Sequence, residues 1–286
     1  MDKLKIESLS PIHIGNGESY LSLFIKNSFK VSEESVFEFY AEEILKSQNY
    51  SYNEDLIRKI VNNKEVLELY KLDEIDKEVL ERRVEILENI KSISKDGKII
   101  FYIPASSLKG FFLTAVLNNE IKKEGKKEFL RILSNRKNIS QIGNFLKKEG
   151  IVNLEIEDCK LNSYKIKIAK VFYSSKKYTF LEVIDEFEGS FRIEINGKYD
   201  INKLLEVSNE YVNEYINMIK NLTNCDKISE ILEKIEKEEN KVILGKFAGI
   251  NSKTIHNHSN KRTRYCKYLE INNKVYPIGF AKLKVL

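Results

Sequence analysis

The sequence predicts an α+β protein made of two ferredoxin-like (RRM-like, βαββαβ) domains with helical insertions. Its 286 residues fit one large or two ordinary domains, and a 42% share of hydrophobic residues is enough to build a core. Hydrophobic patterning gives each half of the chain the order strand, helix, strands, helix, strand, which is the order of a ferredoxin-like domain. We therefore expect domains at residues 1–158 and 159–286.

Strands in the first half are predicted from alternation and from breaks. Apolar and charged residues alternate over 4–7, which predicts an opening strand that stops at Pro11. Two more strands are expected near residues 21–25 and 29–31, after a glycine turn. An apolar run at 99–103 predicts a buried strand.

Helices in the first half are predicted from caps and from helical spacing. Ser35 and Glu38 have the spacing of a capping box, and the apolar residues that follow up to Leu45 recur with the period of a helix. Residues 54–95 are charged and helical in period. We expect two or three helices there, as an insertion.

The second half shows the same kinds of pattern. Alternation and short apolar runs predict strands at 164–168, 180–184, 191–195, 242–244 and 276–285. Apolar residues at helical spacing predict a long helix over 204–219, and helical spacing continues to about residue 239.

Positive charge is concentrated in three segments. The net charge is only +5, yet residues 241–269 hold seven basic residues and no acidic one, and residues 159–181 hold six lysines and no acid. Residues 121–150 hold nine basic and three acidic residues. Such segregation produces local positive potential that attracts a polyanion such as a nucleic acid. The alternative is that each run is merely a solvated face.

Several classes of protein are excluded by composition. No uncharged stretch reaches the ~18–20 apolar residues that span a bilayer, and the first residues do not resemble a signal peptide. We therefore expect a cytoplasmic protein without a membrane partner. The cysteines Cys159, Cys225 and Cys266 are odd in number and form no CxxC pair, so we expect reduced thiols, no metal centre and no cofactor.

The first candidate site is the segment Ser10–Glu18. Gly15 and Gly17 permit backbone conformations that let a loop approach a ligand with its N–H groups exposed. His13 stands at a strand end, where it can donate to a phosphate or act as a general base. The alternative is a packed strand-end histidine beside an ordinary glycine turn.

The second candidate site is the segment Ile103–Leu117, which contains Gly110. Pro104 ends the strand, and Ser106 or Ser107 can cap the helix that follows. With Lys109 in the first turn, the free N–H groups, the helix dipole and the ammonium group all favour an anion.

The third candidate site is the segment 242–268. Gly245, Gly249, Lys253 and Thr254 suggest a phosphate-binding loop, but the P-loop motif requires Gly where Ser252 stands, so a nucleotide-hydrolysing site is not expected. The segment is free of acids and contains aromatic residues, a combination that neutralises phosphates and stacks on bases. Two histidines, His256 and His258, are too few for a metal site.

Together, Ser10–Gly17, Ile103–Gly110, the late glycine-rich loop and Pro277–Leu283 resemble the RAMP superfamily of CRISPR proteins. Within it, they are most similar to the family of the fifth Csm subunit of type III-A effector complexes. Two positions depart from that pattern, with Ala105 where the family usually has Gly and Phe280 where it often has Trp.

The resemblance implies two packed ferredoxin-like domains in a subunit that binds crRNA and caps the effector complex at the 3′ end of the crRNA. It also implies a part in crRNA maturation in antiviral defence, by sheltering that end or by recruiting a host nuclease. The implied partners are crRNA and the other Csm-type RAMP subunits. Members of this family look non-catalytic, and the sequence offers no paired carboxylates and no convincing nucleophile.

Our leading hypothesis is an RNA-binding structural subunit that holds the phosphodiester backbone without reading sequence. The residues expected to contact RNA are His13, Gly15, Gly17, Ser106, Ser107, Lys109, Gly110, Gly245, Lys246, Gly249, Lys253, Thr254, Arg262 and Arg264.

Two alternatives remain open. In the first, the chain is a metal-independent endoribonuclease that processes precursor crRNA. His13 or His256 would then be the general base, and Lys109 or Lys253 would stabilise the developing charge. Otherwise it is a protein-only interaction module whose lysines are solvated.

Overall fold

The computed structural model describes residues 1–47, 52–124, 139–174, 176–245 and 265–286. Its strands are β1 (Asp2–Ser8), β2 (Gly15–Leu21), β3 (Ile25–Lys26), β4 (Phe29–Val31), β5 (Glu68–Lys71), β6 (Glu74–Ile75), β7 (Glu85–Asn89), β8 (Lys91–Ile93), β9 (Ile99–Ile103), β10 (Val152–Ile156), β11 (Cys159–Phe172), β12 (Tyr178–Gly197), β13 (Lys241–Ile243), β14 (Tyr268–Ile271), β15 (Lys274–Tyr276) and β16 (Phe280–Val285). Its helices are α1 (Glu33–Ser47), α2 (Glu54–Asn63), α3 (Lys77–Glu81), α4 (Ala105–Glu124), α6 (Ile139–Lys148), α7 (Ile201–Lys220) and α8 (Ser229–Glu236), with 3-10 turns η1 (Ser22–Phe24) and η2 (Cys225–Ile228).

The central sheet has the strand order of a ferredoxin-like fold. β1 lies between β16 and β12, and β12 also pairs with β10, all antiparallel. Along the chain these elements follow as β1, α4, β10, β12, α7 and β16, which is the βαββαβ order with strands arranged 4-1-3-2. The mixed α+β class predicted from the sequence is therefore confirmed.

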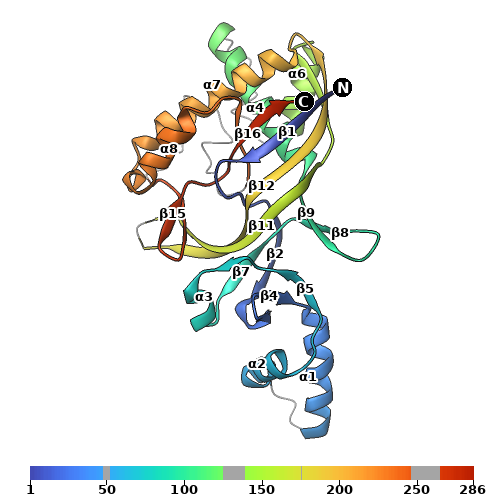
Figure 1. Ribbon diagram of the computed structural model, residues 1–286. Helices are drawn as coiled ribbons and strands as arrows, with labels where there is room; N and C mark the ends of the chain where they lie inside the picture. The colour runs from blue at the N-terminus through green and yellow to red at the C-terminus, as the bar shows by residue number, and fades with distance from the viewer. Residues whose placement is uncertain (48–51, 125–138, 175, 246–264) are drawn as a thin grey trace.

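The sheet is built from both halves of the chain. β1, from the first half, is hydrogen-bonded to β12 and β16 from the second (Figure 1). The predicted boundary at residue 158 falls between β10 and β11, which both pair with β12. Within the described ranges, strand pairing thus gives a ferredoxin-like unit whose strands come from both sides of residue 158. The division into domains 1–158 and 159–286 stays a prediction.

The helices α4 and α7 lie side by side along the sheet (Figure 1). The rings of Phe111 and Tyr211 meet between them at 6.0 Å. Asp200 caps α7 by accepting from the Lys203 N–H at 2.8 Å. The apolar stripe predicted for 204–219 is buried, so the long helix is confirmed.

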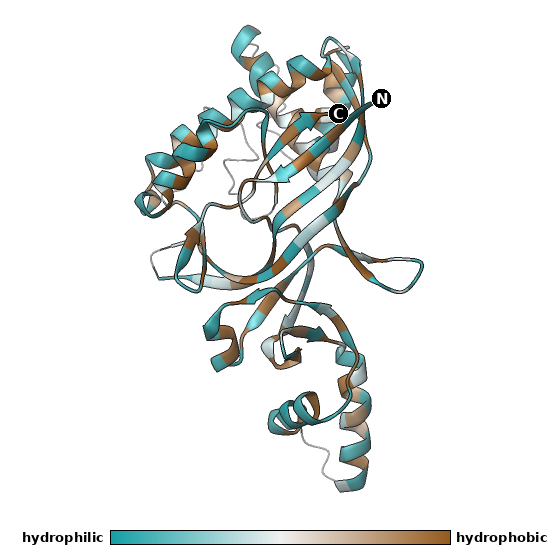
Figure 2. Ribbon diagram, viewed as in Figure 1, coloured by the Kyte–Doolittle hydropathy of each residue, from teal (hydrophilic) through white to brown (hydrophobic). Residues whose placement is uncertain are grey.

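A second, smaller core lies at the far end of the molecule from the two termini (Figure 1). There α1 and α2 pack with the three-stranded sheet β3-β4-β5 around Val31, Val36 and Ile57, all fully buried. Both helices alternate hydrophilic and hydrophobic residues along their turns (Figure 2).

In the part of the chain that the structure describes, no helix is both long and apolar enough to cross a membrane.

Three local predictions need correction. Residues 54–95 contain the helices α2 and α3, which agrees with the expected number, but the segment also forms the short strands β5 to β8. These strands were missed because two to five residues are too few to show a period of two. The strands predicted at 180–184 and 191–195 are one strand, β12. The helix α1 begins at Glu33, with the Ser32 hydroxyl accepting from the Ser35 N–H at 3.2 Å, so Ser35 is not its cap.

Gly189 lies at the crossing of β1, β12 and β11, where it pairs with Ile6 and Leu161. A Cβ at this position would lie 2.6 Å from the carbonyl oxygen of Lys160 and 2.9 Å from Cys159 Sγ. Because strand backbones must move apart to relieve that contact, we expect Gly189→Ala to lower the free energy of unfolding by about 1–3 kcal/mol in urea denaturation. The neighbouring Ser190→Ala is the control and should change it by less than about 0.5 kcal/mol. Equal effects would contradict this explanation.

Candidate nucleic-acid interface

Three of the motifs singled out from the sequence meet in the fold. The Phe280 N–H donates to the Ser10 hydroxyl at 2.9 Å, and the Gly279 N–H donates to the Pro11 carbonyl at 2.9 Å. The Leu244 N–H in turn donates to the Gly279 carbonyl at 2.7 Å. The beginning of the chain, its end and the approach to the late glycine-rich segment therefore lie side by side.

His13 is at the centre of this junction and is only 1% exposed. Its Nδ1–H donates to the Glu182 carbonyl at 2.7 Å, and since a carbonyl only accepts, the proton is on Nδ1. A Cβ on Gly245 would lie 2.5 Å from the His13 carbonyl oxygen, and one on Gly15 would lie 2.9 Å from His13 Nε2. The two glycines thus allow the chain to pack tightly against His13, as in the packed-histidine alternative. Gly17 is exposed, with φ +97°.

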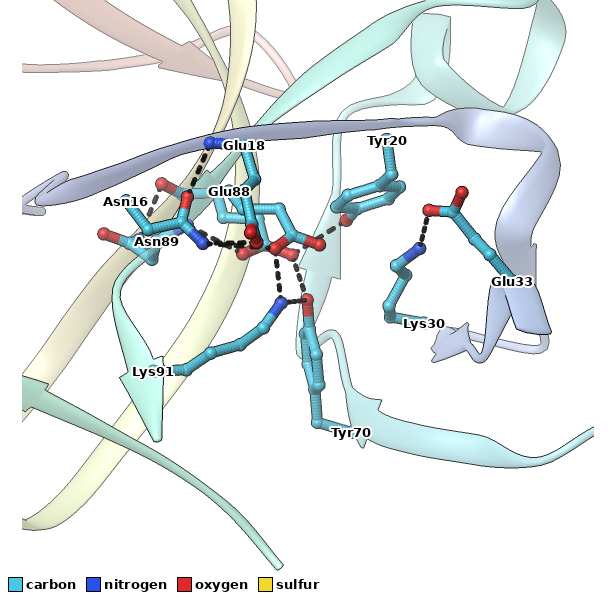
Figure 3. Close-up of polar contacts among 10 residues, drawn as sticks. Asn16, Glu18, Tyr20, Lys30, Glu33, Tyr70, Glu88, Asn89 and Lys91 are labelled. Carbon is cyan, nitrogen blue, oxygen red and sulfur yellow. Dashed lines mark hydrogen bonds and ion pairs between the residues drawn. The ribbon is translucent and has the colours of Figure 1, made fainter. Parts of the chain in front are cut away.

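Below this junction, Glu182 on β12 is a buried carboxylate that joins four strands. It is 0% exposed and accepts hydrogen bonds from the Tyr20 hydroxyl at 2.9 Å, the Tyr70 hydroxyl at 2.6 Å and the Asn89 N–H at 3.0 Å. Figure 3 shows these donors converging from β2, β5 and β7. The Glu182 carbonyl accepts from both His13 and the Asn89 side chain at 2.7 Å. Glu182 therefore anchors the segment that carries His13.

Burial governs the electrostatics of this network. It raises the pKa of Glu182, and the hydrogen bonds from Tyr70 and Asn89 oppose that rise. It lowers the pKa of Lys30, whose ammonium lies 2.9 Å from Glu33 and 4.0 Å from the centre of the Tyr20 ring. Glu182 is thus held by hydrogen bonds and Lys30 by an ion pair, as expected for buried groups in a structural network.

A cleft of about 620 Å³ lies between α4, α6 and β10. Its apolar lining comes from Leu113, Val152 and Leu154, which are buried. Its polar lining is formed by Ser106, Lys109, Asn144, Lys147, Asn153 and Glu155. The cleft shares no lining residue with the junction around His13, so the predicted site residues fall into two separate groups.

The two lysines of the cleft are not neutralised as the lysines of β11 are. Within the described residues, neither Lys109 nor Lys147 takes part in an ion pair, and Lys147 is exposed. Sequence reasoning found Lys109 but missed Lys147 and Asn144, although the positive charge of 121–150 pointed to that region. Two cations facing one partly apolar cleft can hold a phosphate next to a less polar group.

The start of α4 differs from the prediction. The helix begins at Ala105, whose N–H donates to Asp158 Oδ1 at 2.7 Å, so Ser106 and Ser107 lie inside the first turn and do not cap it. Ser106 is exposed and lines the cleft, whereas Ser107 does not. Gly110 is buried, and its carbonyl accepts from the Thr114 hydroxyl at 2.7 Å.

Half of the lysines in 159–181 are neutralised. Lys167 lies 2.8 Å from Asp185 and 3.4 Å from Glu74, which raises its pKa above the ordinary value despite its burial. Lys170 lies 2.9 Å from Glu78, and Lys165 pairs with Glu186. The positive potential expected for this segment is therefore cancelled at these three positions, because acids from distant segments lie against them.

The acid-free stretch is described only at its ends. Lys241 is 0% exposed and donates to the carbonyls of Glu236 and Glu238, and burial lowers its pKa, so it is no surface cation. Lys267 is half-buried. The remaining predicted contacts, Lys246, Gly249, Lys253, Thr254, Arg262 and Arg264, lie in 246–264, outside the described residues, as do His256 and His258.

We predict that Glu182→Gln, which keeps the volume but turns an acceptor oxygen into a donor, lowers the free energy of unfolding by about 1–3 kcal/mol. Because the folded pKa is raised, the unfolded chain loses this proton first as pH rises. The stability advantage of the wild type over E182Q should therefore shrink from the ordinary glutamate pKa of 4.5 up to the folded value. Urea denaturation across this pH range measures it, and an advantage that grows with pH would contradict the assignment.

Comparisons with known proteins agree with the resemblance found in the sequence and with the fold. Residues 5–262 match the sequence profile of the RAMP superfamily. No curated protein matches the chain. The fold is similar to a chain in the cryo-EM structure of a Csm-crRNA-target RNA ternary complex of a type III-A CRISPR-Cas system, with 14% identity and a TM-score of 0.64 over 99% of this chain and 100% of that one. It is also similar to the crystal structure of Csm5 of T. onnurineus, with 15% identity and a TM-score of 0.62 over the same shares. The chain belongs to the RAMP superfamily.

Proposed function

We propose that this protein is a non-catalytic, RNA-binding subunit of a type III-A Csm effector complex, which caps the complex at the 3′ end of the crRNA and supports crRNA maturation. The observation that carries the proposal is the fold, which over nearly its whole length is similar both to Csm5 and to a chain of a complex that contains crRNA. Its partners are crRNA and other Csm-type subunits in the cytoplasm, with a host nuclease for maturation.

Two regions supply the RNA contacts in this proposal. The basic residues of 246–264 follow directly after Gly245, which packs on His13. The cleft supplies Lys109 and Lys147, which form no ion pair among the described residues although Glu155 lines the same cleft. Phosphates are the natural ligands of such cations, and contacts of this kind position RNA without reading its sequence.

The burial of His13 favours a binding subunit over an endoribonuclease. A general base must come within hydrogen-bond reach of the proton that it removes. His13 is enclosed between Gly15 and Gly245, and its Nδ1–H is directed at the Glu182 carbonyl. This position suits a residue that holds the loops together.

We expect single-stranded RNA to bind with a steep dependence on salt. If five of the basic residues in the acid-free stretch 241–269 contact phosphates, the slope of log affinity against log salt is about −3.5, at ~0.7 per contact. Replacing Lys253, Arg262 and Arg264 together with Ala should flatten the slope by about 2 and weaken crRNA retention in the assembled complex. Fluorescence anisotropy measures the slope.

The control for this triple variant is R58A/K59A, which removes two exposed cations from α2 at the far end of the molecule. It should leave the slope unchanged. Salt-independent or absent RNA binding would favour the protein-only alternative. Specific cleavage of precursor crRNA in the presence of chelator, lost on His13→Ala, would favour the endoribonuclease.

The cleft gives a separate prediction. We expect K109Q/K147Q to flatten the salt slope by about 1.4, for two contacts at ~0.7 each, without changing the fold. Lys148→Gln is the matched control, since Lys148 is an exposed neighbour on α6 that does not line the cleft. Equal slopes for K109Q/K147Q and K148Q would show that the cleft makes no RNA contact.

A further inference from the structure

Two of the three cysteines lie against each other in the fold. Cys225, in η2, and Cys266, just before β14, have their Sγ atoms 3.2 Å apart. Both side chains are buried, with exposures of 2% and 3%. This contact was not predicted from the sequence, because 40 residues separate the two positions.

The backbone holds the two segments in this position. The Cys266 N–H donates to the Thr223 carbonyl at 3.0 Å, and Thr223 and Tyr265 form a parallel β-bridge. On the other side of the pair, the Lys227 ammonium donates to the Tyr268 hydroxyl at 2.8 Å. The sulfur atoms therefore face each other because the chain on both sides is fixed, and only a small movement separates contact from a bond.

The hydrogen bond between the two thiols also makes them unequal in acidity. The Cys266 S–H donates to Cys225 Sγ, which lowers the pKa of Cys225 below its ordinary value and raises that of Cys266. The thiolate is the nucleophilic form of cysteine. Burial alone acts on the third cysteine and raises the pKa of Cys159 to about 12, which makes it the inert internal reference.

We propose that Cys225 and Cys266 form a reversible disulfide when the protein meets a peroxide. The Cys225 thiolate attacks one peroxide oxygen, so that an S–O bond forms, the O–O bond breaks and the second oxygen leaves as hydroxide, which becomes water. The Cys266 sulfur then displaces the sulfenic oxygen, so that the S–S bond forms and the Cys266 proton departs with that oxygen as water. Two thiols are oxidised by two electrons in total, and one hydrogen peroxide is reduced to two waters.

The bond ties the start of β14 to the turn after α7. It closes a covalent ring from residue 225 to residue 266, and this ring contains the whole segment 246–264 with its basic residues. A dithiol such as dithiothreitol reverses it by thiol–disulfide exchange. The site is thus a redox-sensitive cross-link at the base of the segment proposed to bind RNA, although its formation does not depend on that proposal.

The test uses the whole purified chain, first reduced and then treated with hydrogen peroxide. After removal of peroxide, unfolding and alkylation with iodoacetamide, intact-mass analysis should show one alkylated cysteine, against three in the reduced protein. Peptide mapping should show a Cys225–Cys266 linkage with the loss of two hydrogen atoms. Dithiothreitol should restore three alkylated cysteines.

Variants separate this pair from general oxidation. Cys159→Ser should leave the cross-link intact, whereas C225S and C266S should each abolish it. If either of these buried variants fails to fold, the mapping of the wild-type chain decides by itself. Three alkylated cysteines after peroxide, separate sulfinic acids, or a linkage through Cys159 would overturn the proposal.

Discussion

The position of β1 between β12 and β16 is the constraint on which the rest of the structure depends. Its apolar residues Leu4 and Ile6 are fully buried and are paired on both sides with strands from the second half of the chain. Neither half can therefore complete the sheet without the other. The same closure places Ser10 beside Phe280 and His13 beside Gly245, so that motifs far apart in sequence meet once β1 is in place.

This arrangement also decides which cations are available to a ligand. Lys167 and Lys170 lie on β11 against carboxylates from β6, α3 and β12, so their charge is neutralised by ion pairs within the protein. Lys109 and Lys147 line a cleft instead and form no ion pair among the described residues. Net charge along the sequence does not distinguish these cases, because the neutralising acids come from segments close only in space.

Sequence reasoning succeeded where one pattern runs long enough to be read. The helix α7 holds its apolar stripe from Leu204 to Ile219, about four turns, and β9 matches the predicted strand at both ends. It missed the strands within 54–95, where β6, for example, spans two residues and is specified by pairing with β11. Likewise, β12 appeared as two strands because charged residues interrupt the apolar run near Glu186, which has φ +46°.

Site residues, too, could be predicted only where a local sequence pattern marks them. Lys109 and Gly245 were found because a turn or a helix start marks them locally. Glu182 was not found, although a single carboxylate within the apolar run 180–184 was a visible signal, because its donors come from three other strands. The glycines around His13 are explained by close packing of the chain against that residue. Lys109 on α4 and Lys147 on α6 instead line the cleft.

Photo-crosslinking of the assembled complex with crRNA that carries 4-thiouridine near its 3′ end tests the central claim most directly. The account predicts crosslinked peptides from 246–264 and from α4 and α6 around the cleft. Crosslinks confined to α1 and α2, or none to this chain, would contradict it.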